Sequence, residues 1–206
     1  MTSFRLIGAA AAASTALLAL ATRSSRVQRL DDALEELAGR HRERLLRVAS
    51  IGTLLGENYA HPTMGAFLAT LILVLRPGGS PWRALVPLAC ASLGAILAHH
   101  AVKLFYRRPR PAIALSRNKL EPAFPSGHTA DATAVLATGA YLLVREGIIA
   151  PTVIIPVAAL LAFVTGLSRV ALGWHWGSDV IGGWLTGLGV AAGCAGVYEM
   201  LRAAAY

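Results

Sequence analysis

Residues 152–179 read TVIIPVAALLAFVTGLSRVALGWHWGSD. Residues 152–170 of this stretch are almost wholly apolar, which is long enough to cross the hydrocarbon core of a bilayer as a helix. Ser168, Arg169, His175 and Asp179 then follow within a few residues. Ionisable groups are costly in a membrane and are rarely found there without a function. The stretch therefore predicts a spanning helix that ends at a functional site.

The remainder of the chain repeats this pattern of long apolar runs closed by Arg, Pro, Gly or His. Hydrophobic residues make up 55% of the 206 residues. The predicted spans are residues 4–22, 61–75, 82–106, 126–144, 152–170 and 179–201. We expect an all-α, polytopic membrane bundle of about six transmembrane helices. It is expected to be a single domain, residues 1–206, with an N-terminal part (1–50) and a catalytic core (51–206).

The N-terminal part contains two different segments. Residues 4–22 favour a retained spanning helix, although a cleaved signal peptide is the competing interpretation. Residues 23–50 alternate arginines and acids, with leucines at roughly helical spacing. This pattern predicts an amphipathic helix at the membrane interface. Asp31 or Asp32 is expected to cap its start.

The formal net charge is +8. In a soluble protein this charge would suggest nucleic acid, but no basic module interleaved with aromatic residues is present. Arginines beside the spans instead indicate contact with anionic headgroups. Cys90 and Cys194 lie in apolar segments and lack the spacing of metal ligands. We expect a membrane partner and no nucleic acid; the oligomeric state is not indicated.

Three short polar clusters interrupt the apolar sequence. They lie at 103–111, 125–128 and 168–179. Counting spans places Lys103 at the end of one helix, Ser126 at the start of the next and Arg169 at the end of the one after. All three clusters therefore reach the same membrane face, opposite the two termini, where they can form one pocket.

Residues 125–128, Pro-Ser-Gly-His, predict an anion site at the start of a helix. Serine is a typical N-cap residue, and glycine allows a ligand to approach the backbone closely. The exposed N–H groups and partial positive charge of a helix start favour phosphate. We expect Ser126 and Gly127 to bind phosphate oxygens and His128 to act as a general acid.

His175 and Asp179 are four residues apart, so on a helix they share one face. A carboxylate on one imidazole nitrogen leaves the other nitrogen as a nucleophile. We hypothesise that His175 attacks phosphorus and that Asp179 orients it. Lys103, Arg110 and Arg169 would hold the phosphate oxygens. Because the chain supplies these cations itself, we expect no metal and no other cofactor.

Other polar residues near the clusters allow more than one interpretation. Arg107, Arg108 and Arg117 are typical of basic side chains that extend to the interface at a helix end. Asp131 could face His128 or only line the bundle. His99 and His100 with His128 could hold a metal, although packing or solvation is the ordinary role of such a pair. Trp174 and Trp176 are typical of an interfacial aromatic belt.

The motifs Lys103-x6-Arg110-Pro111, Pro125-Ser126-Gly127-His128 and Ser168-Arg169-x5-His175-x3-Asp179 together resemble the signature of the type 2 phosphatidic acid phosphatase superfamily. The hydrophobic context resembles its bacterial membrane lipid phosphatases. The resemblance implies a helical core, metal-independent hydrolysis of a phosphomonoester or diphosphate, and a phosphohistidine at His175. Candidate substrates are undecaprenyl diphosphate, phosphatidylglycerol phosphate, phosphatidic acid and related prenyl phosphates, with residues 112–124 helping to choose among them.

Two alternatives stay open at this point. The same superfamily includes vanadium-dependent haloperoxidases, which would use the same pocket. The known haloperoxidases of this superfamily are soluble, however. A non-catalytic lipid-binding or transport protein would suit small helix-packing residues such as Gly182, Gly183 and Gly187. Such a protein gives no reason for two histidines among three cations.

The resemblance also implies a location in the bacterial inner membrane, with the active site facing outward. The arginine count opposes that orientation. Residues 23–50 carry seven arginines on the active side, against five on the other side. We nevertheless expect the outward orientation, because five acids accompany the seven arginines in that segment.

Overall fold

The computed structural model describes residues 2–78, 80–117 and 120–204. Residue 79, between the expected spans 61–75 and 82–106, and residues 118–119, between the expected spans 82–106 and 126–144, lie outside the described residues. The helices are α1 (Thr2–Ala21), α2 (Ser25–Gly52), a short 3-10 turn η1 (Leu54–Gly56), α3 (Ala60–Leu75), α4 (Trp82–Phe105), α5 (Ala112–Ser116), α6 (Gly127–Arg145), α7 (Pro151–Ala171) and α8 (Gly177–Ala203). No strand occurs in these ranges, so the all-α prediction is confirmed.

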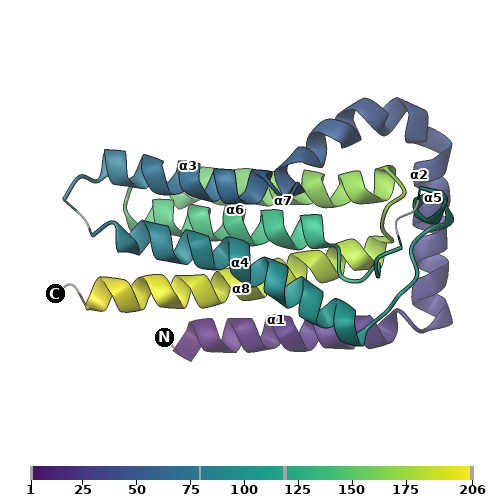
Figure 1. Ribbon diagram of the computed structural model, residues 1–206, viewed down its shortest axis with the longest axis horizontal. Helices are drawn as coiled ribbons and strands as arrows, with labels where there is room; N and C mark the ends of the chain where they lie inside the picture. The colour runs from purple at the N-terminus through teal and green to yellow at the C-terminus, as the bar shows by residue number, and fades with distance from the viewer. Residues whose placement is uncertain (1, 79, 118–119, 205–206) are drawn as a thin grey trace.

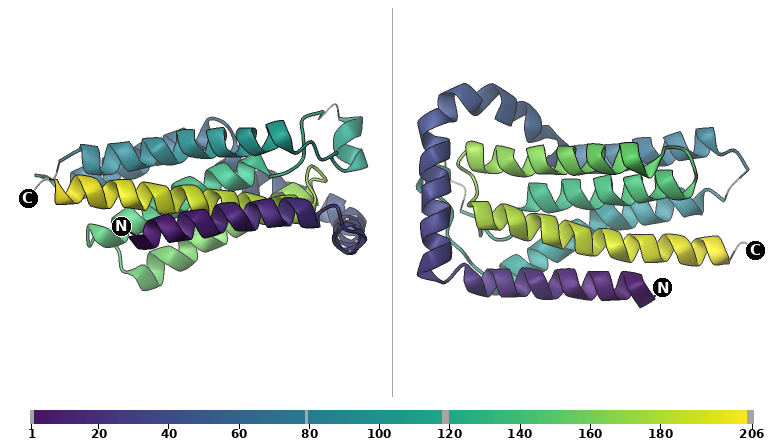
Figure 2. Two further views of the ribbon diagram at one scale, coloured as in Figure 1. Left: turned by 90° about the horizontal axis from the view of Figure 1, so that it is seen from below. Right: turned by 180° about the vertical axis from the view of Figure 1, so that it is seen from behind.

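The long helices other than α2 lie side by side along one axis, and α2 lies across one end of them (Figure 1). Both termini lie at the opposite end. Figure 2 shows the same relation from below and from behind. The end of α4, the start of α6 and the connection from α7 to α8 all lie at the α2 end (Figure 1). The predicted meeting of the three clusters at one end of the bundle is confirmed by this arrangement.

The protein is an integral membrane protein. Among the described residues, α1, α4, α7 and α8 are long and apolar enough to cross a bilayer, and α3 is apolar but shorter. Within the bundle of parallel and antiparallel helices, α6 is buried on nearly all of its faces and contacts α3, α4, α7 and α8. Its polar side chains, such as Asp131 and Thr138, are shielded by neighbouring helices. By length and composition four helices qualify, so the expected number of about six stays a prediction.

Small residues let α8 lie close to α6. A Cβ at Gly183 would be 2.7 Å from Cβ of Thr129, and one at Gly187 would be 2.6 Å from Cβ of Thr133. Real Cβ atoms do not approach so closely, so any larger residue would separate the helices. This contact holds the start of α8 beside the start of α6, where two of the polar clusters lie.

The amphipathic helix expected over residues 23–50 is α2, but the expected cap is wrong. Ser24 is the N-cap residue, and its Oγ accepts a hydrogen bond of 3.4 Å from the Val27 N–H. Ser24 has the extended backbone that a cap requires. Asp31 lies farther along the helix and is buried. Its carboxylate accepts hydrogen bonds from Arg108 and from the Ser178 N–H.

The described part of the connection from α4 to α6 contains a short helix. Pro109 and Pro111 lack the N–H that a continuing helix would use, so α4 ends at Phe105. The short helix α5 follows, with Pro111 at its N-cap position. The Ala123 N–H donates to the Arg108 carbonyl at 2.8 Å and closes the connection on itself.

Candidate active site

A polar cavity of about 840 Å³ lies between α4, α6, α7 and the connections at the α2 end. The predicted site residues that line it are Lys103, Arg110, Gly127, His128, Arg169 and His175. Ser126 and Asp179 are fully buried and lie outside this lining. The structure thus brings residues from all three clusters into one cavity, and places Asp179 behind His175.

His175 lies in the connection between α7 and α8, and both of its ring nitrogens face charged groups. Its Nε2 is 3.1 Å from Nη1 of Arg110. Because a guanidinium can only donate, Nε2 carries the lone pair. Its Nδ1 is 3.4 Å from Oδ2 of Asp179. The ring therefore presents an unprotonated Nε2 beside the cations, as a nucleophile requires.

The surroundings of His175 keep its imidazole neutral. Burial lowers the pKa of His175 well below its usual value, and the charges of Arg110, Arg169 and Lys103 lower it further. The backbone of Ala123 acts in the opposite direction. At neutral pH the ring is therefore in its nucleophilic form.

The turn that presents His175 depends on Gly173. This residue has φ of +69°, in the left-handed region that favours glycine. A Cβ there would also press on the side chains of Ile113 and Arg42. Arg42 in turn donates to the Ala171 carbonyl at 3.0 Å, so α2 braces the turn.

Two of the three cations, Arg110 and Arg169, are held by hydrogen bonds to the protein. Arg110 Nε donates to the Glu121 carbonyl at 2.8 Å, and Nη1 donates to the Trp174 carbonyl at 2.9 Å. Arg169 Nη1 donates to Thr53 Oγ1, and its guanidinium lies 4.1 Å from the centre of the Trp174 ring. Trp174 thus lines the cavity and stacks on a cation instead of forming part of an aromatic belt.

Glu121 is the acidic neighbour of Lys103 and Arg110. Its Oε2 lies 4.0 Å from Lys103 Nζ and 3.9 Å from Arg110 Nη2, and its side chain is 79% exposed. Burial lowers the pKa of Arg110, and Glu121 and Asp179 oppose that shift. An exposed carboxylate at this distance can move away when a phosphate enters.

The start of α6 forms one wall of the cavity. Ser126 is its N-cap residue, and its N–H donates to the Asp179 carbonyl at 2.9 Å. The Ser126 hydroxyl accepts from Thr129 Oγ1 at 2.9 Å. Gly127 borders the cavity, and a Cβ there would lie 3.0 Å from the His99 ring. Of this pair, Gly127 is the residue that a ligand reaches, whereas Ser126 fixes α6 to α8.

His128 lies in the first turn of α6 and faces a carboxylate that the sequence analysis did not single out. Glu57 Oε1 is 3.3 Å from His128 Nε2. The two segments approach closely because residue 56 is glycine: a Cβ there would lie 2.6 Å from His128 Cβ. Asp131 instead faces His99, with Oδ1 and Nε2 3.4 Å apart.

Arg108 lies in a different environment from the one its sequence position predicted. It was expected to extend to the interface but is buried between two carboxylates. Its Nη1 donates to Asp179 Oδ1 at 2.7 Å, and its Nη2 donates to Asp31 Oδ2 at 2.7 Å. Although burial opposes the charge, Asp179 and Asp31 raise the pKa of Arg108. Nothing in the sequence distinguishes Arg108 from the exposed Arg107 beside it.

The metal site considered for His99, His100 and His128 is not formed. Within residues 2–78, 80–117 and 120–204, no three His, Cys, Asp or Glu side chains are grouped as metal ligands. His100 Nδ1 lies 2.9 Å from the Ile96 carbonyl of its own helix. His99 lines the cavity, and its imidazole faces Asp131.

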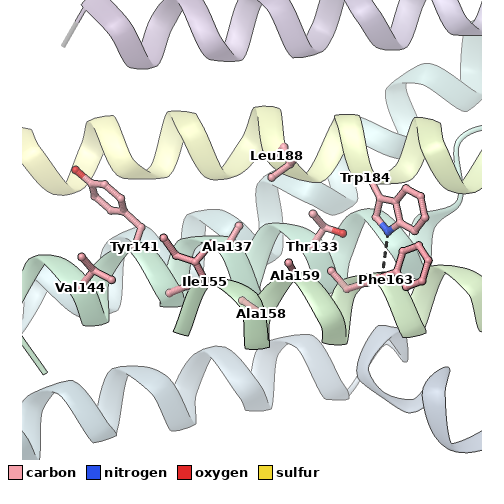
Figure 3. Close-up of a pocket in the computed structure, with 12 residues that line it drawn as sticks. Thr133, Ala137, Tyr141, Val144, Ile155, Ala158, Ala159, Phe163, Trp184 and Leu188 are labelled. Atoms are coloured by element: carbon pink, nitrogen blue, oxygen red, sulfur yellow. Dashed lines mark hydrogen bonds between the residues drawn. The ribbon is translucent and has the colours of Figure 1, made fainter. Parts of the chain in front are cut away.

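A second hollow of about 530 Å³ lies between α6, α7 and α8 (Figure 3). Its walls are almost entirely apolar, and Phe163 stacks on Trp184 with ring centres 5.5 Å apart. The Trp184 Nε1–H donates to the Ala162 carbonyl at 3.0 Å, the dashed line in Figure 3. Such walls suit hydrocarbon and offer a phosphate no cation. Of these two hollows, the polar cavity is therefore the candidate for the chemical site.

The family described as PAP2 superfamily matches residues 84–203 of this chain. This match covers more than half of the 206 residues and all three polar clusters. The chain belongs to the PAP2 superfamily and is a phosphatase, an enzyme that hydrolyses phosphoric esters. The resemblance to the type 2 phosphatidic acid phosphatases is confirmed.

A relative and a solved structure, both from Bacillus subtilis, are similar to this chain. Phosphatidylglycerophosphatase B of strain 168 is 29% identical over 179 residues, which are 84% of this chain and 85% of the relative. A crystal structure described as the first transmembrane PAP2 type phosphatidylglycerolphosphate phosphatase from Bacillus subtilis superposes with a TM-score of 0.76. It is 24% identical, and the superposition covers 94% of this chain and 96% of that one. This likeness shows that the two proteins share a fold.

Proposed function

We propose that this membrane phosphatase hydrolyses a lipid phosphomonoester, foremost phosphatidylglycerol phosphate, through a phosphohistidine at His175. The observation that carries the proposal is the 3.1 Å approach of Arg110 Nη1 to His175 Nε2. It supports the proposal because a nitrogen lone pair and a permanent cation lie at the same point of the cavity. The name of the relative from strain 168 supports this lipid as the first choice.

In the first step, a lipid phosphate enters among Lys103, Arg110 and Arg169. The Arg110 Nη1–H then donates to a phosphate oxygen instead of to His175 Nε2. The freed Nε2 attacks phosphorus, and the bond from phosphorus to the ester oxygen breaks. His128 donates its proton to the departing alkoxide. The three cations stabilise the charge that the transition state spreads over the equatorial oxygens.

In the second step, water attacks the phosphohistidine. The now neutral His128 takes a proton from that water, the bond from Nε2 to phosphorus breaks, and inorganic phosphate leaves. Asp179, 3.4 Å from Nδ1, favours the tautomer that keeps the Nδ1 proton throughout. Fixed cations of the chain carry the role that a metal has in other phosphatases, so we propose that the reaction is metal-independent.

A side-by-side phosphate-release assay tests the substrate. Purified protein would be given phosphatidylglycerol phosphate, phosphatidic acid and undecaprenyl diphosphate in the same detergent, with and without EDTA. We expect the highest kcat/KM for phosphatidylglycerol phosphate and no loss with EDTA. A clear preference for either other lipid would overturn the substrate choice, and inactivation by EDTA would overturn metal independence.

The nucleophile is tested by His175→Ala. We expect turnover to be abolished, with thermal unfolding close to that of the unchanged protein. Rapid-quench labelling with a ³²P-labelled substrate should give an acid-labile, alkali-stable phosphoprotein in the unchanged enzyme and none in the variant. Substantial turnover by His175→Ala would refute the assignment.

We propose that the chain forms one domain in the bacterial inner membrane, with the cavity facing outward. Packing of α1 along α8 and of α2 against α7 supports a single unit of residues 1–206, in which residues 51–206 form the catalytic core. A cysteine introduced between residues 112 and 117, in a background lacking Cys90 and Cys194, tests the orientation. Labelling of intact cells by an impermeant thiol reagent is expected, and labelling only after lysis would reverse the orientation.

A further inference from the structure

We propose that Asp31 and Arg108 are positioning residues for His175, and that they make the active site depend on the crossing helix α2. This inference rests on the proposed function, because it assumes that His175 is the nucleophile. It concerns two residues outside the cavity lining and a chain of contacts, Asp31–Arg108–Asp179–His175, that spans three separate parts of the sequence.

The ionisation of the Asp179 carboxylate depends on two opposing influences. Its side chain is fully buried, and burial favours the protonated form of a carboxylate. Arg108, at 2.7 Å from Oδ1, favours the ionised form. The Trp176 N–H donates to Oδ2 at 2.9 Å and holds the carboxylate at the start of α8. Only the ionised form can accept from His175 Nδ1 with either oxygen, so the charge of Arg108 sets what Asp179 offers to the nucleophile.

The position of the Arg108 guanidinium depends on Asp31. Its guanidinium is shared between Asp179 and Asp31, and Asp31 also accepts from the Ser178 N–H at 2.9 Å and from the Ser178 hydroxyl at 2.6 Å. Both side chains are less than a tenth exposed. A buried arginine needs paired acceptors on its planar fork. Without Asp31, one arm of the fork would lose its partner.

Asp31 belongs to α2 and lies 77 residues from Arg108 in the sequence. α2 crosses the end of the bundle instead of joining it (Figure 1). Its Asp31 reaches the start of α8, and Leu34 on the same side packs against Gly177. The crossing helix therefore supplies a charge on which the orientation of the nucleophile depends, although it contributes no side chain to the cavity lining.

The test uses Arg108→Gln, Asp31→Asn and the matched control Arg107→Gln in the full-length protein. We expect Arg108→Gln to lower kcat by about 10- to 100-fold, the range typical of residues that orient a functional imidazole through a second group. KM should stay within about twofold, because Arg108 does not line the cavity. Asp31→Asn should lower kcat less, and Arg107→Gln should leave it unchanged. Arg108→Lys should restore part of the rate.

A double-mutant cycle separates positioning from general damage. If Arg108 acts through Asp179, then Arg108→Gln should cost little more in an Asp179→Asn background. The proposal would be overturned if the losses of kcat caused by Arg108→Gln and Asp179→Asn multiplied in the double variant. It would also be overturned if Arg108→Gln raised KM with kcat unchanged, or left kcat unchanged. Should Arg108→Gln fail to fold, the near-isosteric Asp31→Asn decides in its place, and full kcat in that variant refutes the role of α2. Failure of the proposed function appears separately, as turnover by His175→Ala.

Discussion

The Oε1 atom of Glu57 lies 3.3 Å from Nε2 of His128, across the gap between η1 and the start of α6. Gly56 permits this approach, because a side chain there would press on the His128 backbone. A carboxylate beside an imidazole stabilises its protonated form, which is the form that a general acid needs.

Glu57→Gln keeps the shape of the side chain and removes its charge. We expect kcat for a lipid phosphate to fall by roughly 10-fold, within the range that general acid catalysis contributes. Hydrolysis of p-nitrophenyl phosphate should fall much less, because nitrophenolate leaves without a proton. Both rates can be followed by phosphate release. Equal losses for the two substrates would mean that Glu57 does not act through leaving-group protonation.

The pH profile should report the neutral state of His175. Because its pKa is lowered well below the usual value, the nucleophile stays neutral as the pH falls through 6.5 and is lost only at lower pH. After burial, Arg110 is the strongest cause of this shift. Arg110→Gln should therefore raise the pKa and move the acidic limb of kcat/KM to higher pH, besides reducing its maximum.

Arg107→Gln is the control for the pH measurement, because it removes an exposed positive charge from the same connection. Ionisation of the substrate phosphate contributes equally to all the profiles and cancels in the comparison. An acidic limb that stays in place in Arg110→Gln would show that Arg110 does not depress the pKa of His175.

Glu121 should compete with phosphate for Lys103 and Arg110. Its carboxylate lies 3.9–4.0 Å from both cation heads while remaining largely exposed. Glu121→Gln should lower the inhibition constant for inorganic phosphate by a fewfold, since an exposed ion pair is worth at most about 1 kcal/mol. Inhibition by phosphate, measured at fixed ionic strength, gives the comparison. Weaker inhibition in the variant would show that Glu121 holds the cations in place instead of competing.

Gly183→Ala should destabilise the bundle. The added Cβ would lie 2.7 Å from Thr129 Cβ and 2.8 Å from the Ser126 carbonyl, so α6 and α8 must separate. Overpacking of this kind typically costs about 1–3 kcal/mol. Thermal unfolding in detergent measures the loss. Gly193→Ala, with no atom within 4 Å of the added Cβ, is the matched control and should be neutral or slightly stabilising.

The helices and much of the candidate site could be predicted from local signals. Apolar runs and the prolines at 109 and 111 place the ends of α4 and α7 within about two residues of the structure. The spacing from Arg169 to His175 and Asp179 identifies a charged turn because such groups are rare in a membrane. The alternation of directions along the chain then brings His128 and His175 to one end.

Tertiary structure alone decided which charges meet. Arg107 and Arg108 are adjacent residues of one type, yet one is exposed and the other joins Asp31 to Asp179. Hydrophobic periodicity determines where a helix forms and which side is apolar. It carries no information on which partner, tens of residues away, a buried side chain will face. That choice depends on helix packing, because only packing removes water from Arg108 and requires two carboxylates in its place.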